Sequence, residues 1–367
     1  MTLLQRMAAR APVPLFAAVG AGAGAAVEAV LLSPAVQRVH TPRHASVLLV
    51  AGAMRPEDGD ALRRLHDQLP HPRATLCWGA GDIEGFERCT AIEAAADPLP
   101  TLRDLYRQLV LREIESEPHM LPDEPPVAWR GKGEHGQGGK GMMGGTPYGR
   151  PMAMTSDDLR DGLALDEYTV ELGPFLPALP SGLVIEVALQ GDVIQRARAN
   201  RLPYDDAPPA HCVGHGRASH ALRRVARMLA LLELPAQAMR CMQLAARSNA
   251  AKPPTPEDIR ELRKSLRRCG AFLAIPHELG RIDPPVAKAL GDVGLTARDR
   301  LTGWLDNAEH ALTKTAPGAG QVPTDAVEGK IDLALTDLLA GLEWHEATLA
   351  IASLDASALQ RLRAEPQ

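Results

Sequence analysis

Aromatic residues, long apolar runs and a strong net charge are all missing from this chain. Phe, Trp and Tyr make up 3% of its 367 residues, so the sequence offers no row of aromatic rings on which nucleic-acid bases would stack. The net charge of −5 gives no reason to expect a nucleic acid partner either. Uninterrupted apolar windows of about eighteen or more residues do not occur, so we expect no membrane-spanning segment.

Cysteine is scarce, and its spacing is irregular. No Cys-x-x-Cys pair occurs among the five cysteines, which are Cys77, Cys89, Cys212, Cys241 and Cys269. An odd and scattered set argues against a disulfide framework and favours a reducing cytoplasm. An iron–sulfur cluster normally needs about four thiolates that converge on one site, and neither half of the chain offers them.

What is present is the composition of an ordinary globular protein. Hydrophobic residues make up 45% of the chain and charged residues 23%. The length suffices for two domains with separate cores, and we expect Ala, Leu and Val to build them. Near the N-terminus, Arg6 and Arg10 precede an apolar segment that resembles a secretory signal. Gly and Ala dominate that segment and Glu28 interrupts it, so we interpret it as a strand and a loop.

The clearest local pattern runs over residues 41–82. Val47–Val50 is an unbroken apolar run, typical of a strand buried on both faces of a parallel sheet. Asp60–Leu69 predicts an amphipathic helix, and Ala74–Trp78 predicts the next strand. This order is a βαβ unit, whose ligands usually lie where the strands end. That edge carries Ala51-Gly52-Ala53 and Gly79-Ala80-Gly81.

Weaker patterns extend this unit and begin a second one. Cys89–Ala95 predicts a short strand, and Leu102–Arg112 a helix that Thr101 caps. Further along, the alternating runs Tyr168–Leu172 and Leu183–Ile194 predict two strands of a hairpin with a ten-residue loop. From Ala218 the spacing becomes helical, with helices predicted over residues 218–234, 236–247, 255–274, 285–290, 297–313 and 324–342 and onward to the C-terminus.

Residues 113–160 predict a linker that is first acidic, then rich in Pro and then rich in Gly. A phosphate-binding P-loop requires a glycine where Glu134 stands and a hydroxyl residue where Gly141 stands. The motif therefore fails around Gly139-Lys140, and we interpret the segment as a connection that lies along a partner.

Two further groups have the residue types of binding sites. His211, Cys212, His215 and His220 offer imidazole and thiolate ligands for Zn²⁺, but no second pair completes the set. A second group of arginines would form a basic face for an acidic subunit or lipid head groups, or a solvated face balanced by acids: Arg223, Arg224, Arg227, Arg260, Arg263, Arg267 and Arg268. Near the C-terminus, Glu343–Glu346 does not match His-Glu-x-x-His, so we expect Trp344 to pack in the core.

The N-terminal part resembles a redox family. Pro42-Arg43 precedes the first buried strand, Val50-Ala51-Gly52 closes it, the helix leads into Pro-x-Pro, and Ala26-Val27-Glu28 lies upstream. The same order occurs in the 20 kDa subunit of NADH:quinone oxidoreductase (complex I) and the small subunit of group 4 NiFe hydrogenases. That resemblance implies a flavodoxin-like parallel sheet and a [4Fe–4S] cluster. The residues at the four ligand positions are Gly24, Ala25, Gly81 and Pro98, which offer no ligand side chain, so we expect no cluster and no other cofactor or metal.

The second part resembles the 49 kDa subunit of complex I and the hydrogenase large subunit. The resemblance is carried by Gly173-Pro174-Phe175-Leu176-Pro177 and Gly191-Asp192-Val193-Ile194. Leu176 stands where the family has a histidine at the quinone-headgroup site, and leucine can neither hydrogen-bond nor protonate a carbonyl oxygen. The family's Tyr-x-His-Arg-Gly-x-Glu segment and its nickel-binding cysteine pairs are not recognisable either.

Together the two resemblances imply a fused small-plus-large subunit with degenerate sites and no activity of its own. The expected fold is an α/β domain over residues 1–112, the linker over 113–160, and an α+β domain with a small sheet and a helical bundle over 161–367. The expected partners are membrane subunits resembling cation/proton antiporters, and the expected place is the cytoplasmic side of the cell membrane. Two alternatives stay open: an active NADH:quinone-type subunit that uses partner-supplied cofactors, and an unrelated cytosolic protein-binding module.

Overall fold

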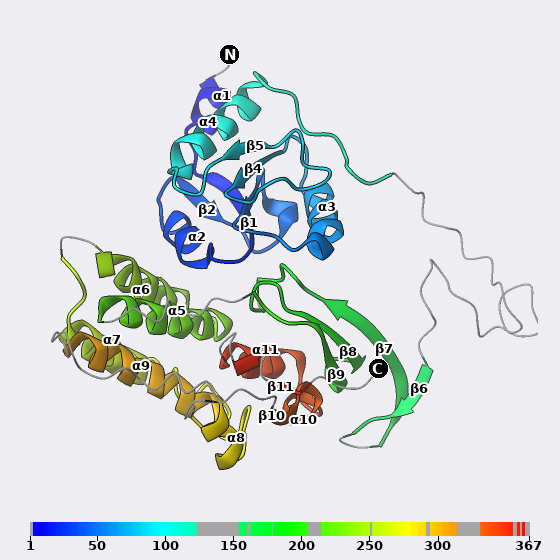
Figure 1. The fold of residues 1–367 in the computed structure, drawn as a ribbon, viewed down its shortest axis with the longest axis vertical. Coiled ribbons are helices and arrows are strands. Elements are labelled where there is room, and N and C mark those ends of the chain that lie inside the picture. The colour runs from blue at the N-terminus through cyan, green and yellow to red at the C-terminus, as the bar shows by residue number, and fades with distance from the viewer. Residues whose placement is uncertain are drawn as a thin grey trace, which may run out of the picture.

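Two units make up the computed structural model, one above the other in Figure 1. The N-terminal unit comprises residues 3–122, and the C-terminal unit comprises the described residues from 154 onward. The structure describes residues 3–122, 154–159, 162–177, 179–204, 214–249, 252–290, 294–313, 331–354, 358–359 and 362–363. The P-loop-like stretch, His211 and Cys212 lie outside the described residues.

The N-terminal unit is built on a parallel sheet of five strands in the order β2-β1-β3-β4-β5. The strands are β1 (Val13–Val19), β2 (Val36–Arg38), β3 (Val47–Ala51), β4 (Ala74–Trp78) and β5 (Thr90–Ile92). Every residue of β3 and β4 is buried, as their unbroken apolar runs predict for strands covered on both faces. The predicted βαβ unit is therefore confirmed, and so is an α/β fold for this part.

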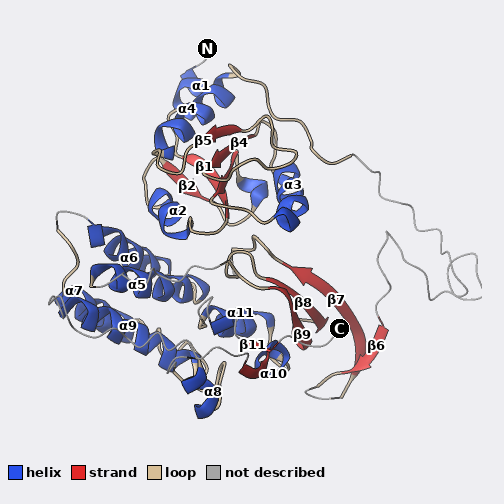
Figure 2. Ribbon diagram, viewed as in Figure 1, coloured by secondary structure: helices blue, strands red, loops and turns tan. Residues whose placement is uncertain are grey.

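Helices cover both faces of this sheet (Figure 2). They are α1 (Leu3–Ala8), α2 (Gly24–Leu31), α3 (Gly59–Gln68) and α4 (Pro98–Leu111). The side chains of α2 and α4 join one face, where Val27, Leu102 and Leu109 pack with Leu49 and the rest of one core cluster. Those of α3 join the other face. Fully burying each such side chain contributes about 1.5–3 kcal/mol.

The start of α4 differs from the sequence prediction. The helix begins at Pro98 rather than Leu102, and its N-cap is Asp97, whose side chain accepts a hydrogen bond of 3.0 Å from the Leu99 amide. Thr101 lies inside the first turns. Proline suits the first helical position because its missing N–H would have no partner there, and this favours the earlier start.

The beginning of the predicted linker lies on the N-terminal unit. The Glu117 carboxylate accepts hydrogen bonds from the Thr75 amide (2.8 Å) and the Thr75 hydroxyl (2.7 Å), at the amino end of β4. The Asp67 carboxylate on α3 accepts from the amides of Met120 and Leu121, both at 2.9 Å. Residues 113–122 are thus bound to the sheet rather than free of it.

The C-terminal unit contains an antiparallel sheet in the order β6-β7-β8-β9. Its strands are β6 (Met154–Asp157), β7 (Ala164–Leu172), β8 (Val184–Gln190) and β9 (Val193–Arg201). The predicted hairpin of β7 and β8 is confirmed. The predicted single strand Leu183–Ile194 is wrong, because the chain turns at Gly191, whose φ of 61° is open to glycine. Residues 193–201 then form the unpredicted strand β9.

Helices and a minor pair of strands complete this unit: α5 (His215–Leu231), α6 (Pro235–Ala246), α7 (Pro256–Arg268), α8 (Pro284–Ala289), α9 (Ala297–Thr313), β10 (Ile331–Ala334), α10 (Leu335–Leu339), α11 (Trp344–Ala352) and β11 (Leu362–Arg363).

The predicted helices over 218–234, 236–247, 285–290 and 297–313 are confirmed, and Thr255 caps α7 in a capping box with Asp258. The helix predicted over 324–342 is wrong at residues 331–334, which form β10. Trp344 packs against the core as expected.

The two units share a hydrophobic core. Phe175 and Tyr204 of the C-terminal unit join the cluster that contains Phe16, Leu48 and Val50 of the first sheet. The face of the sheet that α3 covers is therefore completed by the second unit. No helix among the described residues is long and apolar enough to cross a membrane.

Candidate functional site

A cavity of about 640 Å³ lies between the two units, and we call it the interunit cavity. The N-terminal unit contributes β1, α2 and the end of β2, and the C-terminal unit contributes the loop around Leu176 with α5 and α6. Sites of about 300–1,000 Å³ hold most small ligands. The volume therefore suits a small organic molecule.

The short length of β2 opens the first wall of this cavity. β2 pairs with β1 only from Val13 to Leu15, while β1 continues to Val19 along β3. Ala17, Val19 and Gly20, beyond the last β2 pair, line the cavity. Ligands of open parallel sheets usually lie outside the carboxyl ends of the strands. The interunit cavity lies at the carboxyl ends of β1 and β2. The predicted edges Ala51-Gly52-Ala53 and Gly79-Ala80-Gly81 are not among its walls.

Positive charge dominates the polar part of the lining. Within the part of the chain that the structure describes, four arginines line the cavity together with a single acid, Glu28. Arg223 on α5 forms an ion pair with Glu28 on α2, with 3.2 Å between Nε and Oε2. The guanidinium of Arg224 lies 5.5 Å from the centre of the Trp304 ring, a cation–π distance. The two remaining arginines, Arg38 and Arg227, form no hydrogen bond or ion pair within the described part of the chain.

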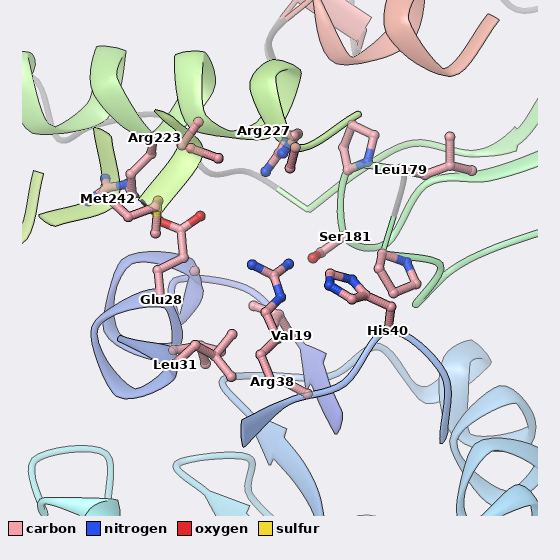
Figure 3. Close-up of a pocket in the computed structure, with 18 of the residues that line it drawn as sticks. Val19, Glu28, Leu31, Arg38, His40, Leu179, Ser181, Arg223, Arg227 and Met242 are labelled. Atoms are coloured by element: carbon pink, nitrogen blue, oxygen red, sulfur yellow. Dashed lines mark ion pairs between the residues drawn. The ribbon is translucent and has the colours of Figure 1, made fainter. Parts of the chain in front are cut away.

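Arg38 and His40 come from the end of β2 and point into the cavity (Figure 3). The side chains of Arg38 and His40 are exposed to the water of the open cavity, while the walls of the cavity lie around them. Burial lowers the pKa of Arg38; Glu28 opposes this and Arg227 adds to it. The pKa of His40 is also lowered, first by burial and then by the charge of Arg38. Both effects disfavour the charged form of His40, so the positive charge in this part of the cavity comes from the arginines.

Apolar side chains form the rest of the lining. Figure 3 shows Leu31 and Val19 from the N-terminal unit, and Leu179 and Met242 from the C-terminal unit, around the charged groups. Leu176 is part of the same wall. The cavity thus combines a group of cationic side chains with apolar walls (Figure 3).

Beside the cavity a polar network joins the units, and we call it the Asp58 network. The fully buried Asp58 carboxylate accepts hydrogen bonds from the Tyr204 hydroxyl (2.5 Å) and the Arg201 guanidinium (2.6 Å). The Arg55 guanidinium lies over the Tyr204 ring at 4.2 Å and donates to the carbonyl oxygens of Leu202 (2.7 Å) and Pro203 (3.0 Å). Burial and the bond to Asp58 raise the pKa of Tyr204 to about 12.

The positions singled out by the sequence resemblance lie at one edge of the first sheet. Gly24 and Ala25 begin α2 after β1, Gly81 follows β4, and Pro98 begins α4 after β5. Because all five strands are parallel, these are carboxyl-end positions. Gly24 and Leu176 both line the interunit cavity, whereas Gly81 and Pro98 do not.

The predicted metal ligands and the predicted basic face are the remaining candidate sites. Among the described residues no three His, Cys, Asp or Glu side chains are grouped for a metal ion. The predicted basic face separates into two sets, because Arg260 and Arg263 on α7 pair with acids of α9 rather than with the cavity. The balanced surface that one of the two predictions described is thus found for Arg260 and Arg263, whereas Arg267 and Arg268 form no ion pair among the described residues.

No protein-family model, curated protein or solved structure matches this chain. The site therefore has to be interpreted from its own residues. Sequence reasoning singled out Arg223 and Arg227 but missed Arg38 and His40. In the sequence, Arg38 and His40 are only basic residues near the end of a short strand. That pattern is too common to identify them as cavity residues.

Proposed function

We propose that this chain is a degenerate peripheral-arm subunit of a complex I-like membrane assembly. In this proposal it fuses a 20 kDa-like part with a 49 kDa-like part. It connects the assembly to ion-translocating membrane subunits from the cytoplasmic side and has no redox centre of its own.

The observation that carries the proposal is the shared cavity. The resemblance implies a quinone-headgroup site at the position of Leu176, and Leu176 lines a cavity to which both units contribute. A chance resemblance in two unrelated segments would give no reason for the segments to meet at that residue. Gly24, which stands at an implied cluster-ligand position, lines the same cavity.

The topology of the first sheet supports the same proposal. The order β2-β1-β3-β4-β5, all parallel with helices on both faces, agrees with a flavodoxin-like sheet. The four implied ligand positions follow strands at one edge of it, as residues holding a common group would. A two-domain division at the linker is part of the proposal as well.

The residues at these positions argue for a connecting role. Leucine, glycine, alanine and proline side chains donate no proton and offer no atom for iron. The Asp58 network and the shared core instead hold the two units together over a buried surface. A subunit that transmits force or position between partners needs such rigidity more than it needs catalytic groups.

Affinity purification tests the assembly. The full chain, tagged and expressed in its own cells, is purified from detergent-solubilised membranes, with the tag alone as control. We expect stoichiometric co-purification of polypeptides that each contain many transmembrane helices. Recovery of the chain alone from the membrane-free fraction would overturn the proposal and favour a cytosolic binding module.

Iron and acid-labile sulfide measurements on the isolated, folded chain test the absence of a redox centre. We expect neither in stoichiometric amount. A visible chromophore in the purified assembly that is lost with this chain would favour a working oxidoreductase subunit instead.

A further inference from the structure

We propose that the interunit cavity binds an amphipathic anion, with a carboxylate or phosphate head between Arg38 and Arg227 and an apolar body against Leu31, Leu179 and Met242. This inference goes beyond the proposed function and does not depend on it. It rests on the lining of the cavity alone.

The first argument is the charge balance. Among the described residues Glu28 is the single acid in the lining, and it forms an ion pair with Arg223. Arg38 and Arg227 face the same cavity and form no hydrogen bond or ion pair among the described residues; the charge of Glu28 favours the charged form of Arg38, and the charge of Arg227 disfavours it. Two like charges in a partly desolvated space repel each other. An anion between them would replace that repulsion by two attractive contacts.

The second argument is the geometry of the donors. Arg38 extends from the end of β2 toward Arg227, which reaches the cavity from α5, and His40 and Ser181 lie beside it (Figure 3). Arg223 and Arg227 are one helical turn apart and so share a face of α5. Guanidinium groups present planar pairs of donors that match the oxygens of carboxylate and phosphate. The Ser181 hydroxyl adds a neutral donor.

The third argument is the size and polarity of the remaining space. A volume of about 640 Å³ is far more than an inorganic anion fills. Apolar side chains such as Leu31, Leu179 and Met242 form much of the remaining wall, and burying a hydrocarbon against them would contribute about 0.8 kcal/mol per methylene group. The fitting ligand therefore joins an anionic head to an apolar chain or ring. Fatty carboxylates and phosphorylated lipids share that chemistry.

The test titrates the full chain with four probes below their micelle-forming concentrations, using calorimetry. The probes are dodecanoate, dodecyl phosphate, dodecanol and inorganic phosphate. We expect saturable binding of one molecule per chain for at least one of the two anionic amphiphiles, and its identity distinguishes the carboxylate from the phosphate source. Dodecanol lacks the charge and phosphate lacks the chain, so each should bind at least about tenfold more weakly.

Charge-removing variants locate the site. Arg38→Gln and Arg227→Leu should each weaken the binding by about ten- to a hundredfold, since each removes charge-assisted hydrogen bonds. Arg260→Leu is the matched control because Arg260 pairs with Glu257 and Glu309 on an exposed surface, and it should leave the affinity unchanged. Equal affinity for dodecanol and the anions, or unchanged affinity in both cavity variants, would overturn the inference. If a cavity variant fails to fold, the four-probe comparison on the native chain still decides.

Discussion

Two neighbouring parts of the surface between the units place arginines in opposite situations. In the Asp58 network, a fully buried carboxylate accepts from Tyr204 and Arg201, and Arg55 is held by backbone carbonyls and an aromatic ring. In the interunit cavity, Arg38 and Arg227 face each other and form no hydrogen bond or ion pair among the described residues, and the charge of Glu28 acts on Arg38 from the same wall. Tyr204 lines the cavity and belongs to the network, so it marks their boundary.

This difference indicates that the Asp58 network stabilises the fold, whereas the interunit cavity has the features of a binding site. Buried polar groups are costly unless each finds a partner, and the Asp58 network meets that condition within the chain. In the cavity, Arg38 and Arg227 form no such hydrogen bond or ion pair among the described residues, and their like charges repel each other. Unfavourable local energetics of this kind are typical of binding sites.

The largest expected effect comes from breaking the network at its acid. Asp58→Ala should lower the free energy of unfolding by about 3–5 kcal/mol, because it leaves the Arg201 guanidinium and the Tyr204 hydroxyl without their buried acceptor. Urea denaturation of the native and variant chains measures the change. A loss below about 1 kcal/mol would mean that the network does not hold the units together.

A smaller effect is expected from removing one hydroxyl group of the same network. Tyr204→Phe keeps the ring under Arg55 and removes only the hydroxyl, which donates to Asp58 and accepts from the Arg55 amide at 3.1 Å. The free energy of unfolding should fall by about 1.5–3 kcal/mol, the range for a hydrogen bond to a charged group. The matched control is Tyr106→Phe: burial alone raises the pKa of Tyr106, and its hydroxyl forms no hydrogen bond among the described residues, so the loss of that hydroxyl should cost little.

Alkaline pH should weaken the network without any substitution. The pKa of Tyr204 is raised to about 12 in the folded chain, above the value of about 10 expected when unfolded. The unfolded chain therefore loses this proton first, so the stabilisation is complete below about pH 10 and is lost as the pH rises toward 12. At pH 11 the loss should be about 1–1.5 kcal/mol. Urea denaturation across this range should show it in the native chain and not in Tyr204→Phe.

The smallest expected effect has the opposite sign and lies in the cavity. Without ligand, Arg227→Leu should leave the free energy of unfolding unchanged or raise it by up to about 1 kcal/mol, because it removes a charge that has no partner. Thermal unfolding of the ligand-free chains measures it. A loss as large as that of Asp58→Ala would show that Arg227 is part of the structural framework, which would remove the contrast between the two regions.

Local sequence patterns predicted most of the helices and strands. The βαβ unit over residues 41–82 and the helix Ala297–Thr313 occur where the periodicity indicates, because burial on a sheet or a helix face imposes that periodicity directly. The errors include a strand, β10, where a helix was predicted, and two misplaced element boundaries. Thr101 was expected to cap α4 and Asp97 does, and Gly191 divides an alternating run into two strands. In both places a proline or glycine overrides the hydrophobic pattern.

The sequence by itself determined the α/β character of the first unit, the hairpin and helices of the second, and the absence of ligand side chains at the positions implied by the resemblance. Only the tertiary structure decided that Arg38 meets Arg227, that Asp58 meets Tyr204, and that Leu176 lines a cavity shared by both units. The physical reason is the distance along the chain. Periodicity reports which side of an element is buried, whereas contacts between residues more than a hundred positions apart depend on how the finished elements pack.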